Sequence, residues 1–177
     1  MINKRVRTPV LLALFTSVMC ITSFIAIPLF GIPITLQSFG VAMALFMLGG
    51  ARATVSVAVY IVIGVIGLPV FSGFGGGLGV LLGPTGGFIF GFLAMALVYC
   101  LITAIFGTSQ LIKIVGCIMG HLLMYAIGSV WYLVFYGGGA GYFDILLVTV
   151  LPFVIPDAVK AALAYFVSKR LSKFIRL

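Results

Sequence analysis

Long apolar runs, separated only by short polar breaks, constrain this sequence more than any other feature. A helix needs about 20 apolar residues to cross a hydrocarbon core of roughly 30 Å, and several runs reach that length. Of the 177 residues, 64% are hydrophobic and 7% are charged, whereas a soluble domain carries about 25% charged residues. The sequence therefore predicts an integral membrane protein with a single membrane domain over residues 1–177 and no soluble domain.

The apolar runs predict an all-α bundle of six transmembrane helices. Their expected ranges are 8–27, 38–48, 53–67, 84–106, 114–136 and, after a short helix and a break, a last helix from about Pro156. Basic residues lie at both ends of the chain and in two breaks, at Arg52 and Lys113, while the other three loops have none. By the positive-inside rule, both termini are expected in the cytoplasm and the three uncharged loops outside.

The net charge of +8 does not indicate nucleic acid as a partner, because the basic residues form no stripe. Contacts with the headgroups of membrane lipids explain these residues better. The isolated residues Cys20, Cys100, Cys117 and His121 form no metal-binding cluster. We therefore expect no metal, no cofactor and no enzyme activity, since a nucleophile–base pair is also missing from the pattern.

The charged pair in the last apolar region points to function. Asp157 is one of two acidic residues in the chain, and it lies three positions before Lys160 in an otherwise apolar stretch. In a helix this spacing places both side chains on one face, and Pro156 suits the first helical position. An ionisable group at bilayer depth costs roughly 2.5–3.5 kcal/mol on insertion scales, which makes a polar ligand site the default interpretation. The alternative is a self-satisfied pair that only fixes helix packing.

A glycine-rich segment, residues 68–85, is expected to be a lid over this site. It has six glycines and no charge, and glycine lets the backbone bend and approach another surface. Phe71 and Phe74 favour a lid over the alternative of a poorly structured connector, which would be rich in serine. His121 has two interpretations, a hydrogen-bonded packing residue or a proton carrier.

Four motifs resemble the BioY family, the biotin-binding S components of energy-coupling-factor (ECF) transporters. They are Ile-Pro-Ile-Thr-Leu-Gln (32–37), Gly-Leu-Pro-Val-Phe-Ser-Gly-Phe (67–74), Gly-Pro-Thr-Gly-Gly-Phe (83–88) and Pro-Phe-Val-Ile-Pro-Asp-Ala-Val-Lys-Ala (152–161). The resemblance implies a six-helix, multi-pass subunit of the bacterial plasma membrane that binds biotin with high affinity. It also implies as partners a transmembrane coupling protein and two cytoplasmic ATPases of an ECF module.

The resemblance also implies site residues. Asp157 and Lys160 match the family's pair implicated in biotin binding, and the loop ending at Gln37 and the segment ending at Thr85 match parts that enclose the ligand. The expected binding residues are thus Thr35, Gln37, Phe71, Phe74, Gly83, Thr85, Asp157 and Lys160. The family's Ala-x-x-x-Ala docking face for the coupling protein has only Ala13 and Ser17 as its nearest match.

Biotin suits these residues chemically, because Asp157 can accept from the N–H groups of the ureido ring. Lys160 can donate either to the ureido carbonyl or to the carboxylate of the tail, and the sequence does not choose between them. Two alternative functions remain: an S component for another vitamin, such as thiamine or riboflavin, and a stand-alone proton-coupled carrier that uses Asp157 and His121.

Overall fold

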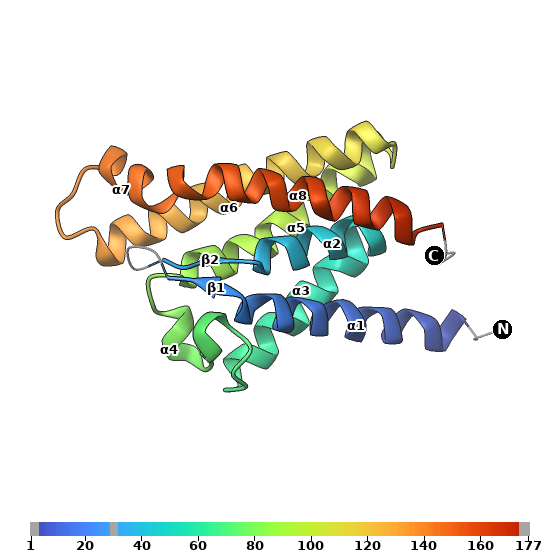
Figure 1. Ribbon diagram of the computed structural model, residues 1–177, viewed down its shortest axis with the longest axis horizontal. Coiled ribbons are helices and arrows are strands. Elements are labelled where there is room, and N and C mark those ends of the chain that lie inside the picture. Colours follow the sequence, from blue (N-terminus) through green and yellow to red (C-terminus); the bar gives the residue numbers. More distant parts are fainter. Residues whose placement is uncertain (1–3, 29–31, 174–177) are drawn as a thin grey trace.

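The computed structural model describes residues 4–28 and 32–173 as a bundle of helices (Figure 1). In chain order these are α1 (Lys4–Phe24), α2 (Gln37–Leu48), α3 (Gly50–Val65), the 3-10 helix η1 (Ser72–Phe74), α4 (Leu78–Leu81), α5 (Gly86–Phe106), α6 (Gln110–Tyr136), α7 (Tyr142–Thr149) and α8 (Leu151–Leu171). Two short strands, β1 (Ala26–Ile27) and β2 (Ile34–Thr35), pair antiparallel between α1 and α2.

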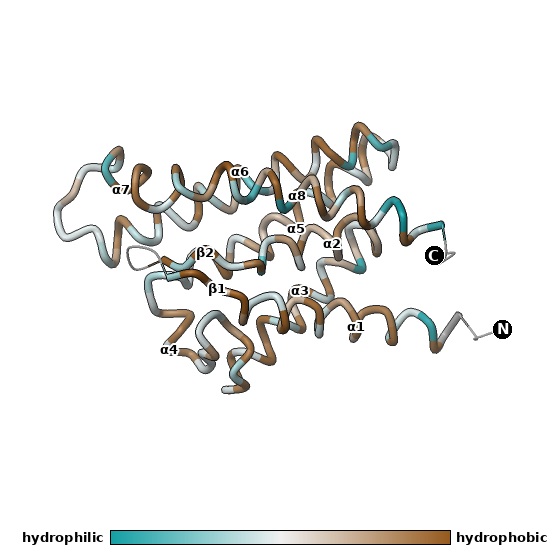
Figure 2. The backbone as a smooth tube through the Cα atoms, in the orientation of Figure 1, coloured by the Kyte–Doolittle hydropathy of each residue, from teal (hydrophilic) through white to brown (hydrophobic). Residues whose placement is uncertain are grey.

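Four helices are long and apolar enough to cross a membrane: 6–24 in α1, and α5, α6 and α8. The apolar helices α2 and α3 have 12 and 16 residues, and at 1.5 Å per residue both fall short of a bilayer core of about 30 Å. Large apolar side chains are exposed along α5, α6 and α8, and Figure 2 shows apolar residues along most of the bundle. The outer surface therefore suits contact with lipid.

Both chain ends lie at the same end of the long axis in Figure 1. The turns between α2 and α3 and between α5 and α6 lie there too, whereas the β1–β2 pair, α4 and the connection from α6 to α7 lie at the opposite end. Arg52 and Lys113 lie in the first turns of α3 and α6, directly after these two connections. The basic breaks and the uncharged loops are thus separated in space along the bundle.

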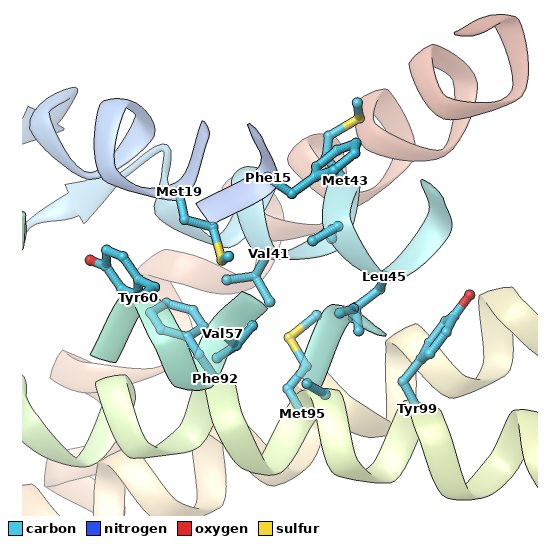
Figure 3. Packing of buried hydrophobic residues seen from close by; sticks show 14 of the residues in the cluster. Phe15, Met19, Val41, Met43, Leu45, Val57, Tyr60, Phe92, Met95 and Tyr99 are labelled. Atoms are coloured by element: carbon cyan, nitrogen blue, oxygen red, sulfur yellow. The ribbon is translucent and has the colours of Figure 1, made fainter. Parts of the chain in front are cut away.

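The short helix α2 lies at the centre of the bundle and packs against α1, α3, α5 and α8. Ten of its 12 residues are buried, which fits a helix that is apolar on all sides. Figure 3 shows Val41 and Leu45 of α2 among side chains of α1, α3 and α5, including Met19, Val57 and Met95. A helix too short to span the membrane alone is thus held by neighbours on every side.

Glycines bring α5 and α6 into close contact. A Cβ atom at Gly120 would lie 2.9 Å from the Met95 carbonyl oxygen, and one at Gly91 would lie 3.0 Å from the Cα of Met124. Small residues of this kind let membrane helices approach at backbone distance. The α5–α6 pair accordingly forms the most extensive helix contact of the structure.

The start of the last helix differs from the sequence-based prediction. We predict Pro156 at its first position, but α8 begins at Leu151, with Pro152 in the first turn and Pro156 inside the helix. Pro152 fills the position where a missing N–H costs nothing, and Pro156 gives up only the bond to the carbonyl four residues earlier. Asp157 and Lys160 still lie on one face of the helix, as their spacing predicts, and this face of α8 is buried.

The first helix also ends earlier than predicted, at Phe24 rather than residue 27. Residues 26–27 form β1 instead, so the expected all-α bundle includes one short strand pair. Ile27 precedes Pro28, and a residue before proline is disfavoured in the helical region. Of the predicted segments, residues 30–31 of the first loop and Arg176 of the basic C-terminus lie outside the described residues.

The close α5–α6 packing predicts unequal costs for two glycine substitutions in α6. Gly120→Ala would press a methyl group to 2.9 Å from backbone of α5, whereas at Gly116 the nearest atom would be the Tyr99 ring at 3.2 Å and the nearest backbone would lie at 3.6 Å. Both changes gain the same helix propensity, so Gly116 is the matched control. Overpacking typically costs about 1–3 kcal/mol, and thermal unfolding in detergent should show a lower midpoint for Gly120→Ala than for Gly116→Ala. Equal midpoints would contradict the packing described here.

Candidate functional site

A cavity of about 60 Å³ lies at the end of the bundle that carries the uncharged loops. Its walls come from the segment before α2, the first turn of α2, the 68–85 segment, α5, α6 and α8. The lining residues are Ile32, Pro33, Thr35, Gln37, Ser38, Phe71, Ser72, Thr85, Phe88, Ile89, Phe92, Tyr125, Phe153, Asp157 and Lys160. Apolar walls with a few convergent polar groups are typical of a small-molecule site.

Asp157 is the polar centre of this cavity and is 4% exposed. Its Oδ1 accepts a hydrogen bond from Ser38 Oγ at 2.7 Å and pairs with Lys160 Nζ at 2.5 Å. Its Oδ2 accepts from Tyr125 O–H at 2.7 Å. A carboxylate offers about four lone-pair sites, so these three contacts leave one acceptor position, on Oδ2.

Lys160 has a protein acceptor for each of its three N–H bonds. Besides Asp157, the ammonium donates to the Thr35 carbonyl oxygen at 2.8 Å and to Ser38 Oγ at 3.0 Å. The same side chain therefore ties α8 to the end of β2 and to the first turn of α2. The pair is internally satisfied, as the packing interpretation requires, and it also lines the cavity, as the ligand interpretation requires.

Six of the eight predicted site residues line the cavity: Thr35, Gln37, Phe71, Thr85, Asp157 and Lys160. The other two are not among the lining residues. Phe74 is 66% exposed, and its ring stacks on Phe24 with the centroids 4.5 Å apart. The Gly83 carbonyl accepts a hydrogen bond from Trp131 Nε1 at 3.0 Å. A ligand contact by Phe74 or Gly83 stays a prediction.

Three polar residues of the cavity escape sequence reasoning, Ser38, Ser72 and Tyr125, and of these Ser38 and Tyr125 contact Asp157. Ser38 directly follows the predicted residue Gln37, so it enters the cavity from the first turn of α2. Tyr125 lies in the middle of α6, where nothing in the sequence distinguishes it from the other tyrosines of that helix. Both neutral groups donate to Asp157, and the apolar wall residues Phe88, Ile89, Phe92 and Phe153 are equally indistinct in sequence.

The 68–85 segment has a defined conformation, as expected for a lid rather than for a poorly structured connector. Phe71 is 1% exposed and packs its ring edge-on against Tyr60, with the centroids 5.5 Å apart. Gly73 and Phe74 both have positive φ, 68° and 58°. The left-handed region is unfavourable for a residue with a Cβ by roughly 1–2 kcal/mol, so the turn is strained at Phe74.

Both ends of the 68–85 segment are hydrogen-bonded to neighbouring helices. At the first end the Val70 carbonyl accepts hydrogen bonds from Ser23 Oγ at 2.6 Å and Tyr60 O–H at 3.0 Å. At the other the Leu82 carbonyl accepts from Tyr136 O–H at 2.6 Å, next to the Trp131–Gly83 bond. In the middle of the segment, Gly77 N–H donates to the Gly64 carbonyl of α3 at 2.7 Å, and the Phe74 ring stacks on Phe24 of α1.

His121 lies beside the site without joining it. Its Nδ1 bonds to the Cys117 carbonyl at 2.9 Å, one turn earlier in α6, and the residue is not among those lining the cavity. Over residues 4–28 and 32–173, no hydrogen-bond partner reaches Nε2, and no cluster of possible metal ligands occurs. These contacts favour the packing interpretation of His121 over a proton relay with Asp157.

The sequence matches the model of the BioY family over residues 1–177. "Biotin transporter BioY" of Thermotoga maritima is 38% identical over 163 residues, which cover 90% of this chain and 92% of that protein. "Probable biotin transporter BioY" of Pyrococcus horikoshii is 36% identical over 161 residues, covering 91% and 93%. A crystal structure of "the S-component for biotin from an ECF-type ABC transporter" is 30% identical, with a TM-score of 0.84 over 98% of this chain and 95% of that chain.

Removal of Lys160 should destabilise the fold through Asp157. Lys160→Ala leaves a buried carboxylate without its cation, and breaking a buried pair in this way costs about 3–5 kcal/mol. Asp157→Asn alone likewise leaves the Lys160 ammonium without its anion. The double change Asp157→Asn with Lys160→Ala removes both charges and should recover part of the loss, because no buried charge is then left without a partner. Thermal unfolding of the two single variants and the double variant measures this cycle. Additive losses would show that the two residues do not stabilise each other.

Proposed function

The chain belongs to the BioY family, and we propose that it captures biotin as the membrane-embedded S component of an ECF-type transporter. The whole chain then acts as one substrate-binding membrane domain with a role in transport, and ATP hydrolysis belongs to its partners. The observation that carries the proposal is the buried Asp157–Lys160 pair on the wall of a mostly apolar cavity.

The polar groups of the cavity complement a cyclic urea. Asp157 has one acceptor position open on Oδ2, which fits a ureido N–H. Lys160 can reach the ureido carbonyl only by exchanging one of its present acceptors, and the Thr35 carbonyl is the chemically equivalent group. The rings of Phe71, Phe88 and Phe92 supply apolar surface for the bicycle. Such a buried polar site rejects ligands that lack a matching donor by large factors.

The cavity must enlarge to hold biotin. Its volume of about 60 Å³ is well below the roughly 300–1,000 Å³ of typical ligand pockets. The segments that close it are the lid and residues 32–36, and the latter are held by pairing with β1, by the Leu36 N–H bond to the Ile25 carbonyl and by Lys160 on the Thr35 carbonyl. We propose that biotin takes the place of the Thr35 carbonyl on Lys160 and that the lid closes over the bound ligand.

The topology and partners follow from the same family. We propose six membrane-embedded helices, α1, α2, α3, α5, α6 and α8, with both termini in the cytoplasm. Support comes from the position of Arg52 and Lys113 at the end of the bundle that carries the chain ends. The coupling protein would dock on α1, where Ala13 and Ser17 are exposed one turn apart, and two ATPases would drive the module.

Equilibrium binding of labelled biotin to the purified chain in detergent tests the proposal, with thiamine and riboflavin as competitors. We expect tight binding that excess thiamine and riboflavin do not displace. Displacement by another vitamin would reassign the substrate within the same transporter class. A folded sample that binds no biotin would refute the proposed function.

Loss of either charged side chain should weaken biotin binding. Asp157→Asn and Lys160→Ala should each cost at least about 2 kcal/mol of binding free energy, the scale of a charge-assisted hydrogen bond. Isothermal titration of each variant measures the loss, after unfolding curves confirm that the sample is folded. Unchanged affinity in a folded variant would remove that residue from the site.

Docking on α1 should be separable from ligand binding. Ala13→Trp places a large ring on an exposed position of α1 and should prevent copurification with the coupling protein while biotin affinity stays within about twofold of wild type, since surface changes are usually within ±0.5 kcal/mol. Val134→Trp, on an exposed position of α6, is the matched control. Intact assembly of the Ala13→Trp variant would place the docking face elsewhere.

A further inference from the structure

Three connected hydrogen bonds lead from the cavity wall to the first residues of the 68–85 segment. Gln37 Nε2 lies 2.7 Å from Tyr60 Oη, and Tyr60 O–H donates to the Val70 carbonyl at 3.0 Å. Ser23 Oγ donates to the same carbonyl at 2.6 Å. Gln37 lines the cavity, while Tyr60 and Ser23 do not, so a residue of the wall is connected to buried residues behind it.

The direction of each of these hydrogen bonds follows from the Val70 carbonyl at one end of the series. A carbonyl oxygen can only accept, and two oxygens 3.0 Å apart with no hydrogen between them repel each other. Tyr60 must therefore give its single proton to Val70. It can then only accept from Gln37, and the only donor of that side chain is its NH₂ group. The amide nitrogen of Gln37 thus faces Tyr60.

The orientation of the Gln37 amide decides what the site offers to a ligand. With one N–H of Nε2 held by Tyr60, the amide of Gln37 presents the acceptor Oε1, which no donor of the described residues reaches, and the second N–H points in another direction. The two ends of an amide are nearly equal in shape and opposite in hydrogen-bond character. A freely rotating amide could turn either end toward a given ligand group, whereas a fixed amide keeps Oε1 in one position, where it can only accept from a donor.

We propose that Tyr60 is a positioning residue that fixes the Gln37 amide, so that Gln37 Oε1 reads an N–H group of the ligand. The inference rests on the proposed function in naming a ureido N–H as that group. Gln37 then supplies a second acceptor beside Asp157 Oδ2, which matches the two N–H donors of a cyclic urea. The specificity of the cavity depends on a phenol that the ligand does not touch.

The fully buried position of Tyr60 makes this role strict. Tyr60 has 0% exposure, and its ring packs edge-on against Phe71 of the lid. No bulk water reaches the hydroxyl, so no water replaces it as the partner of Gln37, whereas the Val70 carbonyl keeps its bond from Ser23. The low-dielectric surroundings strengthen each bond and make an unpaired member costly.

Tyr60→Phe tests the proposal, because it removes the hydroxyl and keeps the ring. We expect the affinity for biotin to fall about tenfold or more, the size of one buried hydrogen bond. We also expect the preference for biotin over an N-methylated biotin to fall by a similar factor. Desthiobiotin has the same ureido group as biotin, so the ratio of the biotin affinity to the desthiobiotin affinity should stay constant. A merely structural defect would lower all three affinities together.

Two control variants separate the amide from the lid. Tyr99→Phe makes the same chemical change at a tyrosine that is also fully buried, lies outside the cavity and has no hydroxyl partner among the described residues. It should bind like wild type. Ser23→Ala removes the other donor to Val70 and leaves Gln37 bonded to Tyr60, so it should keep the discrimination. Equal discrimination in wild type and Tyr60→Phe, or an equal loss in Ser23→Ala, would overturn the proposal.

The positioning role of Tyr60 can be tested even if the proposed function is wrong. If the wild-type chain binds no biotin, the proposed function fails, and the ligand-free protein still reports on the amide. The side-chain NH₂ resonances of Gln37, assigned by their loss in Gln37→Glu, should shift in Tyr60→Phe and not in Tyr99→Phe. Unchanged Gln37 resonances in Tyr60→Phe would overturn the positioning role.

Discussion

A charged pair in the apolar interior of a membrane bundle needs compensation from its surroundings, and here several elements supply it. Asp157 accepts hydrogen bonds from Ser38 of α2 and Tyr125 of α6, and it pairs with Lys160 of its own helix. Lys160 in turn holds the Thr35 carbonyl at the end of β2. A buried pair is costly unless its remaining donors and acceptors are also satisfied. The same contacts that offset this cost bring α2, α6, α8 and the 32–36 segment to one place.

The bundle positions these contacts through α2 and the glycine-rich helix pair. The short α2 is surrounded by α1, α3, α5 and α8, so its first turn, with Gln37 and Ser38, is fixed against the pair on α8. Close α5–α6 packing at Gly91 and Gly120 sets the position of Tyr125 opposite α8. Among the parts that line the cavity, the 68–85 and 32–36 segments lie outside the long helices, and we propose that they move to admit a ligand.

Sequence reasoning finds the charged centre because two ionisable residues stand out in an apolar helix, and it singles out the 68–85 segment, which lines the cavity, because six glycines interrupt the apolar pattern. It misses Ser38 and Tyr125, since neutral polar residues are common in membrane helices and only the fold brings them to Asp157. It does not separate Phe71 from Phe74: a turn with two positive φ values sends one ring into the core and leaves the other exposed. The start of α8 is also misplaced, because Pro152 and Pro156 suit a first turn equally well.

The central claim is that the Asp157–Lys160 pair is the polar centre of a biotin site rather than a packing device. A structure of the chain with biotin bound tests it most directly. The account predicts a ureido N–H within about 3 Å of Asp157 Oδ2, hydrogen-bond distance, together with loss of the present contact between Lys160 and the Thr35 carbonyl or a displaced lid. Biotin bound elsewhere, with the pair and the Thr35 contact unchanged, would contradict the account and leave the pair as a packing device.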